Sequence, residues 1–463
     1  MNYSINKKLF KSKELLIINY SLLILLLSSC SVSSQISKEA NKTILRDSAA
    51  SKGFIGISIY DPATGKYLYN YNATKYFTPA SNTKLFSLYA GMKYLGDSLV
   101  GAMVEERWDG IRIFGTGDPT FLHPDFKYQP VFDYLRSKKT MPLWLERNFD
   151  SYDPRTGPIP VYGDGWSWSD YNDDYMAERN FFPIYGNVVR FNMDDSGRVH
   201  AVPKYFERKL MHFKYPEKKV IIKRDLEENS FNAVGTKKPG AEIVIPFKTG
   251  EDFGITTKYI MNTVDSLLSD TLGVTVNYAE ATLPKFVTFR KIRSQPADSL
   301  FRPMMHRSDN FFAEQTLLMV SNERLGYMND ADIIDTLLNT DLKDIPQRPK
   351  WVDGSGLSRY NLFTPQSFIY ILNKLRTEFG WDRVRNILPT GGEGTLSSYF
   401  HKDSGFIYAK TGTLSNNCAL SGFLLTDKGK LLIFSILANH YQGGATPIRK
   451  ASERFLEAIR HKY

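Results

Sequence analysis

Strand-like segments at both ends of the chain constrain the fold more than any other feature of the sequence. Apolar and polar residues alternate as they do in β-strands over residues 54–60, 66–71, 406–413, 418–425 and 431–438. Turn-forming residues at 61–65 and 426–430 predict that the first two and the last two strands form β-hairpins. A helix is expected at about 447–460, where apolar residues share one face. We therefore expect both chain ends to build one domain around a five-stranded antiparallel sheet, with the middle of the chain inserted into it.

Length and composition are those of a globular protein with more than one domain. At roughly 150 residues per domain, a chain of 463 residues predicts two or three. A hydrophobic fraction of 42% and a charged fraction of 23% exclude a disordered or fibrous chain. One long apolar run, at residues 15–27, is too little for a multi-span membrane protein. We assign 46–99 and 290–463 to the domain formed by the chain ends, and 100–289 to one or two small inserted β-rich domains.

The N-terminus has the pattern of an export signal. Lysines precede the apolar run, which ends in Leu-Ser-Ser-Cys at 27–30. This ending resembles the lipobox of bacterial lipoproteins, in which the cysteine carries the lipid. We expect a lipoprotein signal peptide at 1–29, lipidation of Cys30 and a polar tether at 30–45; the alternative is an uncleaved anchor helix. Either way the folded part lies outside the cytoplasm. The lipoprotein interpretation implies the periplasmic side of the cell envelope, lipid-anchored to a membrane.

Charge and residue types exclude several classes of function. The formal net charge of +10 is a mild bias without a basic cluster, so no nucleic-acid partner is expected. Cys30 and Cys418 are the only cysteines, which rules out a disulfide framework and a cysteine-based zinc site. Cys418 is expected to be a small apolar residue on a strand. The histidines show no i,i+4 pair, and we predict neither a metal nor a cofactor.

A serine and a lysine at helical spacing form the first candidate catalytic pair. Pro79 and the apolar residues after it predict the start of a buried helix, with Ser81 and Lys84 on one face. A serine hydroxyl becomes a nucleophile when a neighbouring base takes its proton. A lysine can be that base when burial and a second cation lower its pKa. Taken alone the pair is weak evidence, because most such pairs are a capping serine and a surface lysine.

Two further motifs give this pair a specific meaning. Ser-Asp-Asn at 308–310 begins a second apolar helix, and Lys-Thr-Gly-Thr at 410–413 lies on a predicted strand. Together with Ser-x-x-Lys, and in this order, they are the motifs of class A β-lactamases and penicillin-binding proteins. The gap between Ser81 and Ser308 is too long for a compact single-domain β-lactamase.

The long first gap resembles the penicillin-binding protein 4 family of D-alanyl-D-alanine carboxypeptidases and endopeptidases, peptidase family S13. Four further blocks are similar to that family, at 114–120, 165–168, 353–361 and 388–396. From the residues alone, the block at 353–361 is a glycine-rich turn below the site. The resemblance implies an α/β (α+β) fold, with a β-lactamase/transpeptidase-like domain whose five-stranded antiparallel sheet is flanked by helices.

The resemblance also implies a role for each motif residue. Ser81 would attack the D-Ala-D-Ala carbonyl and become acylated, with Lys84 as the base. Ser308 would relay a proton toward the leaving amine, and Asn310 would hold Lys84 and the substrate amide. Lys410 would attract the substrate carboxylate and depress the pKa of Lys84.

The remaining strand residues complete the implied substrate site. Thr411 and Thr413 would bind the substrate carboxylate through their hydroxyls, with Gly412 between them. The backbone N–H groups of Ser81 and Thr413 would form the oxyanion hole. The implied partners are peptidoglycan stem peptides, with β-lactam antibiotics as covalent inhibitors.

Two other functions fit the same motifs less well. A secreted serine β-lactamase would need a deacylating glutamate between the second and third motifs, and no glutamate occurs between Glu323 and Glu378. A non-catalytic penicillin-binding sensor would be expected to lose Ser81 or Lys84, and both are present. The sequence leaves open whether a carboxypeptidase or an endopeptidase activity dominates.

Overall fold

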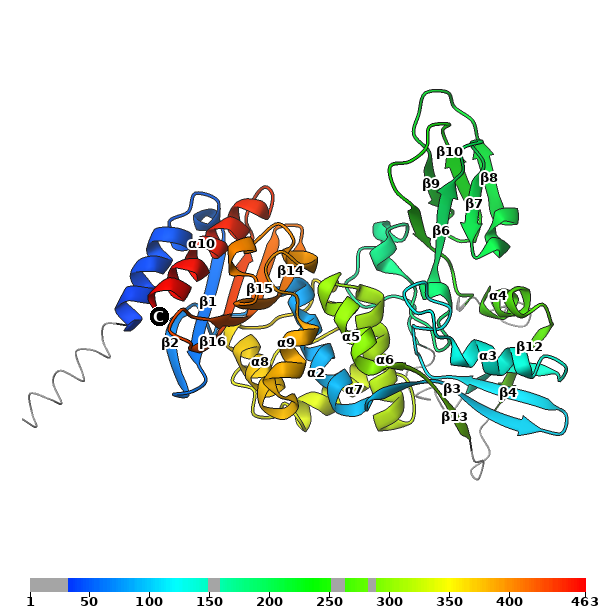
Figure 1. Ribbon diagram of the computed structural model, residues 1–463, viewed down its shortest axis with the longest axis horizontal. Helices are drawn as coiled ribbons and strands as arrows, with labels where there is room; N and C mark the ends of the chain where they lie inside the picture. The colour runs from blue at the N-terminus through cyan, green and yellow to red at the C-terminus, as the bar shows by residue number, and fades with distance from the viewer. Residues whose placement is uncertain (1–31, 149–158, 251–262, 282–288) are drawn as a thin grey trace, which may run out of the picture.

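The computed structural model describes residues 32–148, 159–250, 263–281 and 289–463 (Figure 1). The predicted signal peptide and Cys30 lie outside these residues. Within the described ranges, no helix combines the length and the apolar character needed to cross a membrane.

The two chain ends meet in one antiparallel sheet, as the sequence predicts. Its strand order is β14-β15-β16-β1-β2, so the N-terminal hairpin joins the three C-terminal strands through β1 and β16. The strands are β1 Phe54–Asp61, β2 Lys66–Tyr71, β14 Ile407–Leu414, β15 Asn417–Leu425 and β16 Leu431–Asn439. Both faces of the central strands are buried, which explains their long apolar runs. The predicted fold class is confirmed.

Helices cover both faces of this sheet (Figure 1). On one face α10 (Thr446–Lys462) packs its apolar stripe on the sheet. On the other face, α2 belongs to a layer of helices whose buried apolar side chains form one core with those of the sheet. That layer consists of α2 Lys84–Tyr94, α5 Ala297–His306, α6 Asn310–Leu325, α7 Asp330–Asn339, α8 Pro365–Phe379 and α9 Trp381–Ile387.

The predicted tether at 30–45 is wrong for the part that the structure describes. Residues 32–40 are helical and continue into a π-helical turn at Asn41–Leu45. Ile36, Ala40 and Ile44 recur every four residues and are fully buried in the cluster that contains α10. Figure 1 shows this N-terminal helix beside α10. An apolar stripe at helical spacing within an otherwise polar segment therefore docks this helix on the domain.

The insertion begins and ends with two long strands that pair with each other. β3 (Ser98–Arg107) and β13 (Arg290–Pro296) are antiparallel neighbours in a second sheet of order β12-β5-β4-β3-β13. Its other strands are β4 Gly110–Gly115, β5 Leu143–Asn148 and β12 Val276–Ala281, with α3 (Pro130–Ser137) and α4 (Thr263–Leu272) beside them. The structure therefore places residues 98–99 and 290–296 in the insertion, whereas the sequence predicted them in the other domain.

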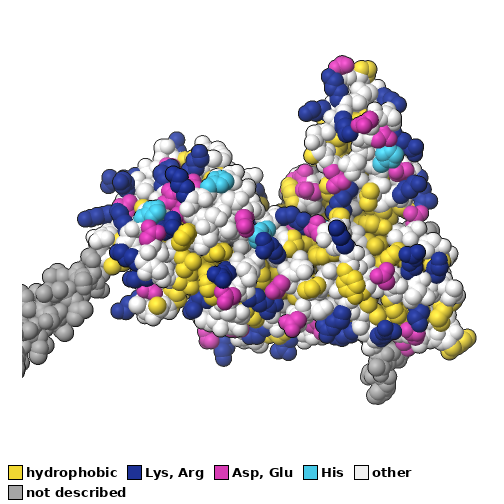
Figure 2. Space-filling model, viewed as in Figure 1, with side chains coloured by type: hydrophobic (Ala, Val, Ile, Leu, Met, Phe, Trp, Pro, Cys, Tyr) yellow, Lys and Arg dark blue, Asp and Glu magenta, His cyan; other side chains and the backbone are white. Residues whose placement is uncertain are grey.

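Two small three-stranded sheets form the far part of the insertion. Their orders are β11-β6-β7 and β8-β10-β9. The strands are β6 Val188–Met193, β7 Val199–Val202, β8 Leu210–Phe213, β9 Ile221–Arg224, β10 Phe231–Val234 and β11 Ile243–Pro246. Figure 1 shows β8, β9 and β10 on a lobe that projects away from the helical layer. On the face of the described residues seen in Figure 2, basic and acidic side chains are interspersed.

Candidate active site

The nucleophile motif lies on a tight turn that leads into α2. Ala80–Thr83 form a 3-10 turn and α2 begins at Lys84, so the Lys84 side chain lies one turn beyond Ser81. The Lys84 Nζ is 3.1 Å from the Ser81 Oγ. Ala80 has a φ of 49°, a left-handed conformation that costs a non-glycine residue about 1 kcal/mol. The chain therefore holds the serine in a locally strained turn at the end of a buried helix.

Three oxygen atoms surround the Lys84 amine. Besides Ser81 Oγ, the Nζ lies 2.6 Å from Asn310 Oδ1 and 2.7 Å from the Ser355 carbonyl. Burial lowers the pKa of Lys84 to about 8, although nearby carboxylates, Asp353 first among them, act in the opposite direction. Lys84 can therefore exist as a neutral amine at mildly alkaline pH, as a general base requires.

The second motif reaches the same amine from α6. Asp309 caps this helix, with its carboxylate accepting from the Phe312 N–H at 3.0 Å, and Asn310 is the first residue of the helix. The Asn310 Nδ2 donates to the Tyr175 carbonyl of the insertion at 3.1 Å. This contact fixes the amide so that its oxygen faces Lys84. Ser308, just before the cap, has a left-handed φ of 62°.

The third motif brings a second lysine. Lys410 Nζ donates to Ser308 Oγ at 2.9 Å and to the Thr411 carbonyl at 2.8 Å. Its side chain is fully buried. Burial, followed by the nearby Lys84 charge, lowers the pKa of Lys410 well below its usual value. The Lys84 charge therefore acts on Lys410, whereas the expected effect of Lys410 on the pKa of Lys84 stays a prediction.

Gly412 allows strand β14 to lie directly against the nucleophile turn. A Cβ at this position would lie 2.7 Å from the Pro79 carbonyl oxygen and 3.0 Å from the Ser81 nitrogen. Any side chain there would push the strand and the turn apart. The close approach sets the backbone of Thr413 beside Ser81.

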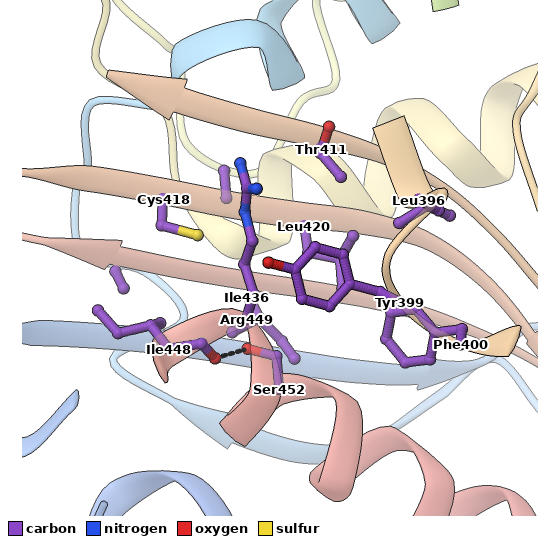
Figure 3. Close-up of a pocket in the computed structure, with 12 residues that line it drawn as sticks. Leu396, Tyr399, Phe400, Thr411, Cys418, Leu420, Ile436, Ile448, Arg449 and Ser452 are labelled. Carbon is purple, nitrogen blue, oxygen red and sulfur yellow. Dashed lines mark hydrogen bonds between the residues drawn. The ribbon is translucent and has the colours of Figure 1, made fainter. Parts of the chain in front are cut away.

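The two threonines of the motif have different surroundings. Thr413 lines the cleft with Ser81, whereas Thr411 is buried and lines the small space between β14 and α10. Figure 3 shows that space, with Arg449 extending from α10 between Cys418 and Tyr399. The Arg449 guanidinium donates to Thr413 Oγ1. The structure thus brings Thr413 to the cleft and leaves the Thr411 hydroxyl outside it, and sequence reasoning missed Arg449.

The block at 353–361 does more than turn the chain below the site. Its Ser355 carbonyl is one of the three oxygen atoms around Lys84. The buried Asp353 carboxylate holds the block in shape by accepting from the Gly356 N–H at 2.9 Å, the Ser358 N–H at 2.6 Å and Asn361 Nδ2 at 2.6 Å. Trp166 of the insertion also donates to Asp353, at 2.9 Å.

An open cleft of about 670 Å³ lies at this site. Ser81, Ser308 and Asn310 line it together with Thr413 at the end of β14. The insertion contributes the opposite part of the wall, which contains Trp166, Asp170, Tyr175 and Met176. A substrate in this cleft would therefore contact both parts of the molecule. In the ranges that the structure describes, no cluster of three or more metal-binding side chains occurs.

Comparison with known proteins identifies the family of the chain. The model of the D-Ala-D-Ala carboxypeptidase 3 (S13) family matches residues 38–459. The chain belongs to this family. Its members act as serine-type D-Ala-D-Ala peptidases. The family and the enzyme class that the sequence predicts are therefore confirmed.

Individual relatives span most of the chain. It is 24% identical over 454 residues to a penicillin-sensitive carboxypeptidase A of Dictyostelium discoideum, covering 84% of this chain and 83% of the relative. It is 24% identical over 449 residues to a D-alanyl-D-alanine carboxypeptidase of an Actinomadura species, covering 88% and 82%. The crystal structure of penicillin binding protein 4 from Haemophilus influenzae superposes with a TM-score of 0.69 at 18% identity, covering 92% of this chain and 99% of that one.

Proposed function

We propose that Ser81 is the nucleophile and Lys84 the general base of a serine peptidase that cuts the D-Ala-D-Ala bond of peptidoglycan stem peptides. The observation that carries this proposal is the buried Lys84 amine, 3.1 Å from Ser81 Oγ and with a pKa of about 8. In the neutral form, Lys84 accepts the Ser81 proton while Oγ attacks the carbonyl carbon.

The negatively charged oxygen of the tetrahedral intermediate forms where strand β14 meets the turn at Ala80–Thr83. The backbone N–H groups of Ser81 and Thr413 are the donors we assign to it, supported by the close approach of Gly412 to the nucleophile turn. Removal of one such donor typically costs about 3 kcal/mol of transition-state stabilisation.

Departure of D-alanine requires a proton on its amine. Ser308 can deliver it, because its hydroxyl contacts Lys410 Nζ at 2.9 Å and borders the cleft. Ser308 regains its proton from the Lys84 ammonium, so the proton taken from Ser81 ends on the leaving amine and Lys84 is again neutral. The carbonyl carbon remains bound to Ser81 Oγ as an ester. Water then hydrolyses this acyl-enzyme and regenerates the serine.

The substrate carboxylate belongs near the end of β14. Lys410 and Arg449 contact this strand and can provide positive charge there, and Thr413 lines the cleft. Penicillins present a carboxylate and a strained amide in a similar arrangement, so they should acylate Ser81.

A product analysis tests the activity. Purified protein is incubated with muropeptide monomers ending in D-Ala-D-Ala and with cross-linked dimers, and the products are identified by mass. Loss of one D-alanine from monomers indicates carboxypeptidase activity, and conversion of dimers to monomers indicates endopeptidase activity. The Ser81→Ala variant should release neither product. Release that persists in this variant would contradict the assignment.

We further propose that the mature protein is a lipoprotein of the cell envelope, on the basis of the Leu-Ser-Ser-Cys sequence at 27–30. Firm anchoring requires more than one acyl chain, which lipoprotein processing supplies. Cys30→Ser should abolish metabolic labelling with a fatty acid and block maturation at that site. Unchanged labelling of this variant would disprove lipidation at Cys30.

A further inference from the structure

The lone pair of the Lys84 amine has to point at Ser81 for the proposed reaction to occur. A neutral amine has two N–H donors and one lone pair, whereas an ammonium has three donors and no lone pair. Asn310 Oδ1 and the Ser355 carbonyl can only accept. When both take the N–H groups of the neutral amine, the lone pair remains for the Ser81 proton. The positions of these two acceptors therefore determine whether Lys84 can act as a base.

Both acceptors are fixed by α6. Asn310 is its first residue, and Glu314 follows one helical turn later on the same face. Glu314 Oε1 accepts from the Ser355 N–H at 2.7 Å. Helix α6 thus holds one acceptor directly and the other through the Glu314 carboxylate.

The Ser355–Gly356 peptide group has little freedom between these contacts. Its carbonyl faces Lys84, and its N–H donates to Asp353 Oδ1 at 2.9 Å. Gly356 has a left-handed φ of 85°, and a Cβ there would lie 2.0 Å from the Ala80 carbonyl oxygen. A small rotation at Ser355 would therefore move the acceptor of Lys84.

The charge of Glu314 is offset by an arginine of the insertion. Arg179 Nη1 lies 3.4 Å from Glu314 Oε2, and both side chains are only 1% exposed. Arg179 is held by the Pro160 and Tyr162 carbonyls, each at 3.0 Å, and also contacts Asp330 of α7. Burial, and next the charge of Asp353, raises the pKa of Glu314 to about 7, and the Arg179 charge opposes that rise. Glu314 is therefore charged in the alkaline range in which Lys84 loses its proton.

We propose that Glu314, together with Arg179 of the insertion, is a positioning residue for Lys84: it holds the Ser355 carbonyl on one N–H of the amine and so directs the lone pair at Ser81. This inference rests on the proposed function, because it assigns a support to the base of that reaction. It also gives the insertion a part in the chemistry, although no side chain in its described part is hydrogen-bonded to the Lys84 amine.

The charges around Lys84 determine the direction of the pH effect. Glu314 and Asp309 face it from α6, Asp353 from the 353–361 block and Lys410 from β14. The three carboxylates favour the ammonium form. Removal of the Glu314 charge should therefore lower the pKa of Lys84, so that the base is available at lower pH but points less well at Ser81.

The test is the rate of acylation by benzylpenicillin between pH 6 and 10, measured on the full chain by intact-protein mass. Glu314→Gln preserves shape, but its amide cannot offer one oxygen to the Ser355 N–H and another to Arg179. We expect its acylation plateau to fall at least about tenfold, as misplacement near reacting groups does. The midpoint of its acid limb should move to lower pH.

Asp330→Asn is the matched control. It also removes a carboxylate from Arg179, but Asp330 has no contact with the 353–361 block among the bonds described above. We expect a comparable fall in melting temperature, an acylation plateau within about twofold of the parent and an unshifted acid limb. Arg179→Lys, which keeps the charge, should retain more of the plateau than Arg179→Gln.

The outcomes separate this inference from the function on which it rests. A parent protein that benzylpenicillin does not acylate would overturn the assigned catalytic roles and this inference with them. An acylated parent with an unchanged plateau and acid limb in Glu314→Gln would overturn the inference alone. Equal slowing at every pH in Glu314→Gln and Asp330→Asn would also overturn it, because that pattern reports lost structure rather than a displaced base.

Discussion

The catalytic domain and the insertion contribute to the same cleft in different ways. The domain formed by the chain ends supplies the side chains assigned to bond-making, above all Ser81 and Lys84. The insertion supplies contacts that hold them: the Tyr175 carbonyl on Asn310, Trp166 on Asp353 and Arg179 beside Glu314. The difference implies that substitutions in the first region should remove the chemistry, whereas those in the second should weaken its support.

The largest effect is expected for Ser81→Ala. Loss of the nucleophile in a serine hydrolase lowers kcat by on the order of 10⁶-fold. The hydroxyl contacts only Lys84 in the bonds described above, so the melting temperature should change little. Steady-state release of D-alanine and a thermal melt measure the two effects. A variant that kept a hundredth of the parent rate would show that another group attacks the substrate.

Substitution of Lys84, the proposed base, should lower activity nearly as much as Ser81→Ala. The pH dependence of the parent protein should report the titration of Lys84. Lys84→Ala removes the buried amine that hydrogen-bonds to Ser81 Oγ, and nucleophile and base act as a unit. In the parent, the acylation rate should rise with pH around pH 8, because Lys84 acts in its deprotonated form and burial lowers its pKa to about 8. Stopped-flow acylation across this pH range is the measurement. Near-normal acylation of Lys84→Ala at neutral pH would assign the base to another residue.

The fold was predictable where hydrophobic patterning is local. Alternation and turn residues identify the five strands around β1 and β16, and motif spacing identifies Ser81, Lys84 and Lys410. The supporting contacts were not predictable, because the Ser355 carbonyl is a backbone atom and Glu314 meets Arg179 only in the folded chain. The helix at 32–40 was missed because its serine, lysine and glutamate content is that of a linker, although the spacing of Ile36, Ala40 and Ile44 was a usable signal.

A smaller effect, on substrate selectivity, is expected at Arg449. Its guanidinium holds Thr413 Oγ1 at the edge of the cleft. Arg449→Gln should raise KM for a peptide ending in D-Ala-D-Ala by about tenfold, roughly the value of one charge-assisted hydrogen bond. The corresponding peptide amide, which lacks the carboxylate, should be affected much less. An equal loss for acid and amide would mean that Arg449 does not act through the substrate carboxylate.

The smallest effect on catalysis is expected from the insertion residue Trp166. Trp166→Phe removes the indole N–H that donates to Asp353 at 2.9 Å, while Asp353 keeps its bonds within the 353–361 block. We expect a loss of about 1–2 kcal/mol in unfolding free energy and a decrease in kcat of less than about tenfold. Chemical denaturation and steady-state kinetics give the two values. A decrease as large as that of Lys84→Ala would erase the distinction between the two regions.

We expect a Ser81 ester to form in a cleft where, among the described residues, none is assigned to its rapid hydrolysis. The most direct test is to add benzylpenicillin, remove the excess by gel filtration, and determine the intact mass and the modified peptide. We predict one penicilloyl group per chain, on the peptide containing Ser81, and slow recovery of the free protein. The opened ring keeps its amine tethered beside the ester, where it hinders the approach of water. Rapid turnover of a chromogenic cephalosporin without a trapped adduct, or an adduct on a serine other than Ser81, would contradict this account.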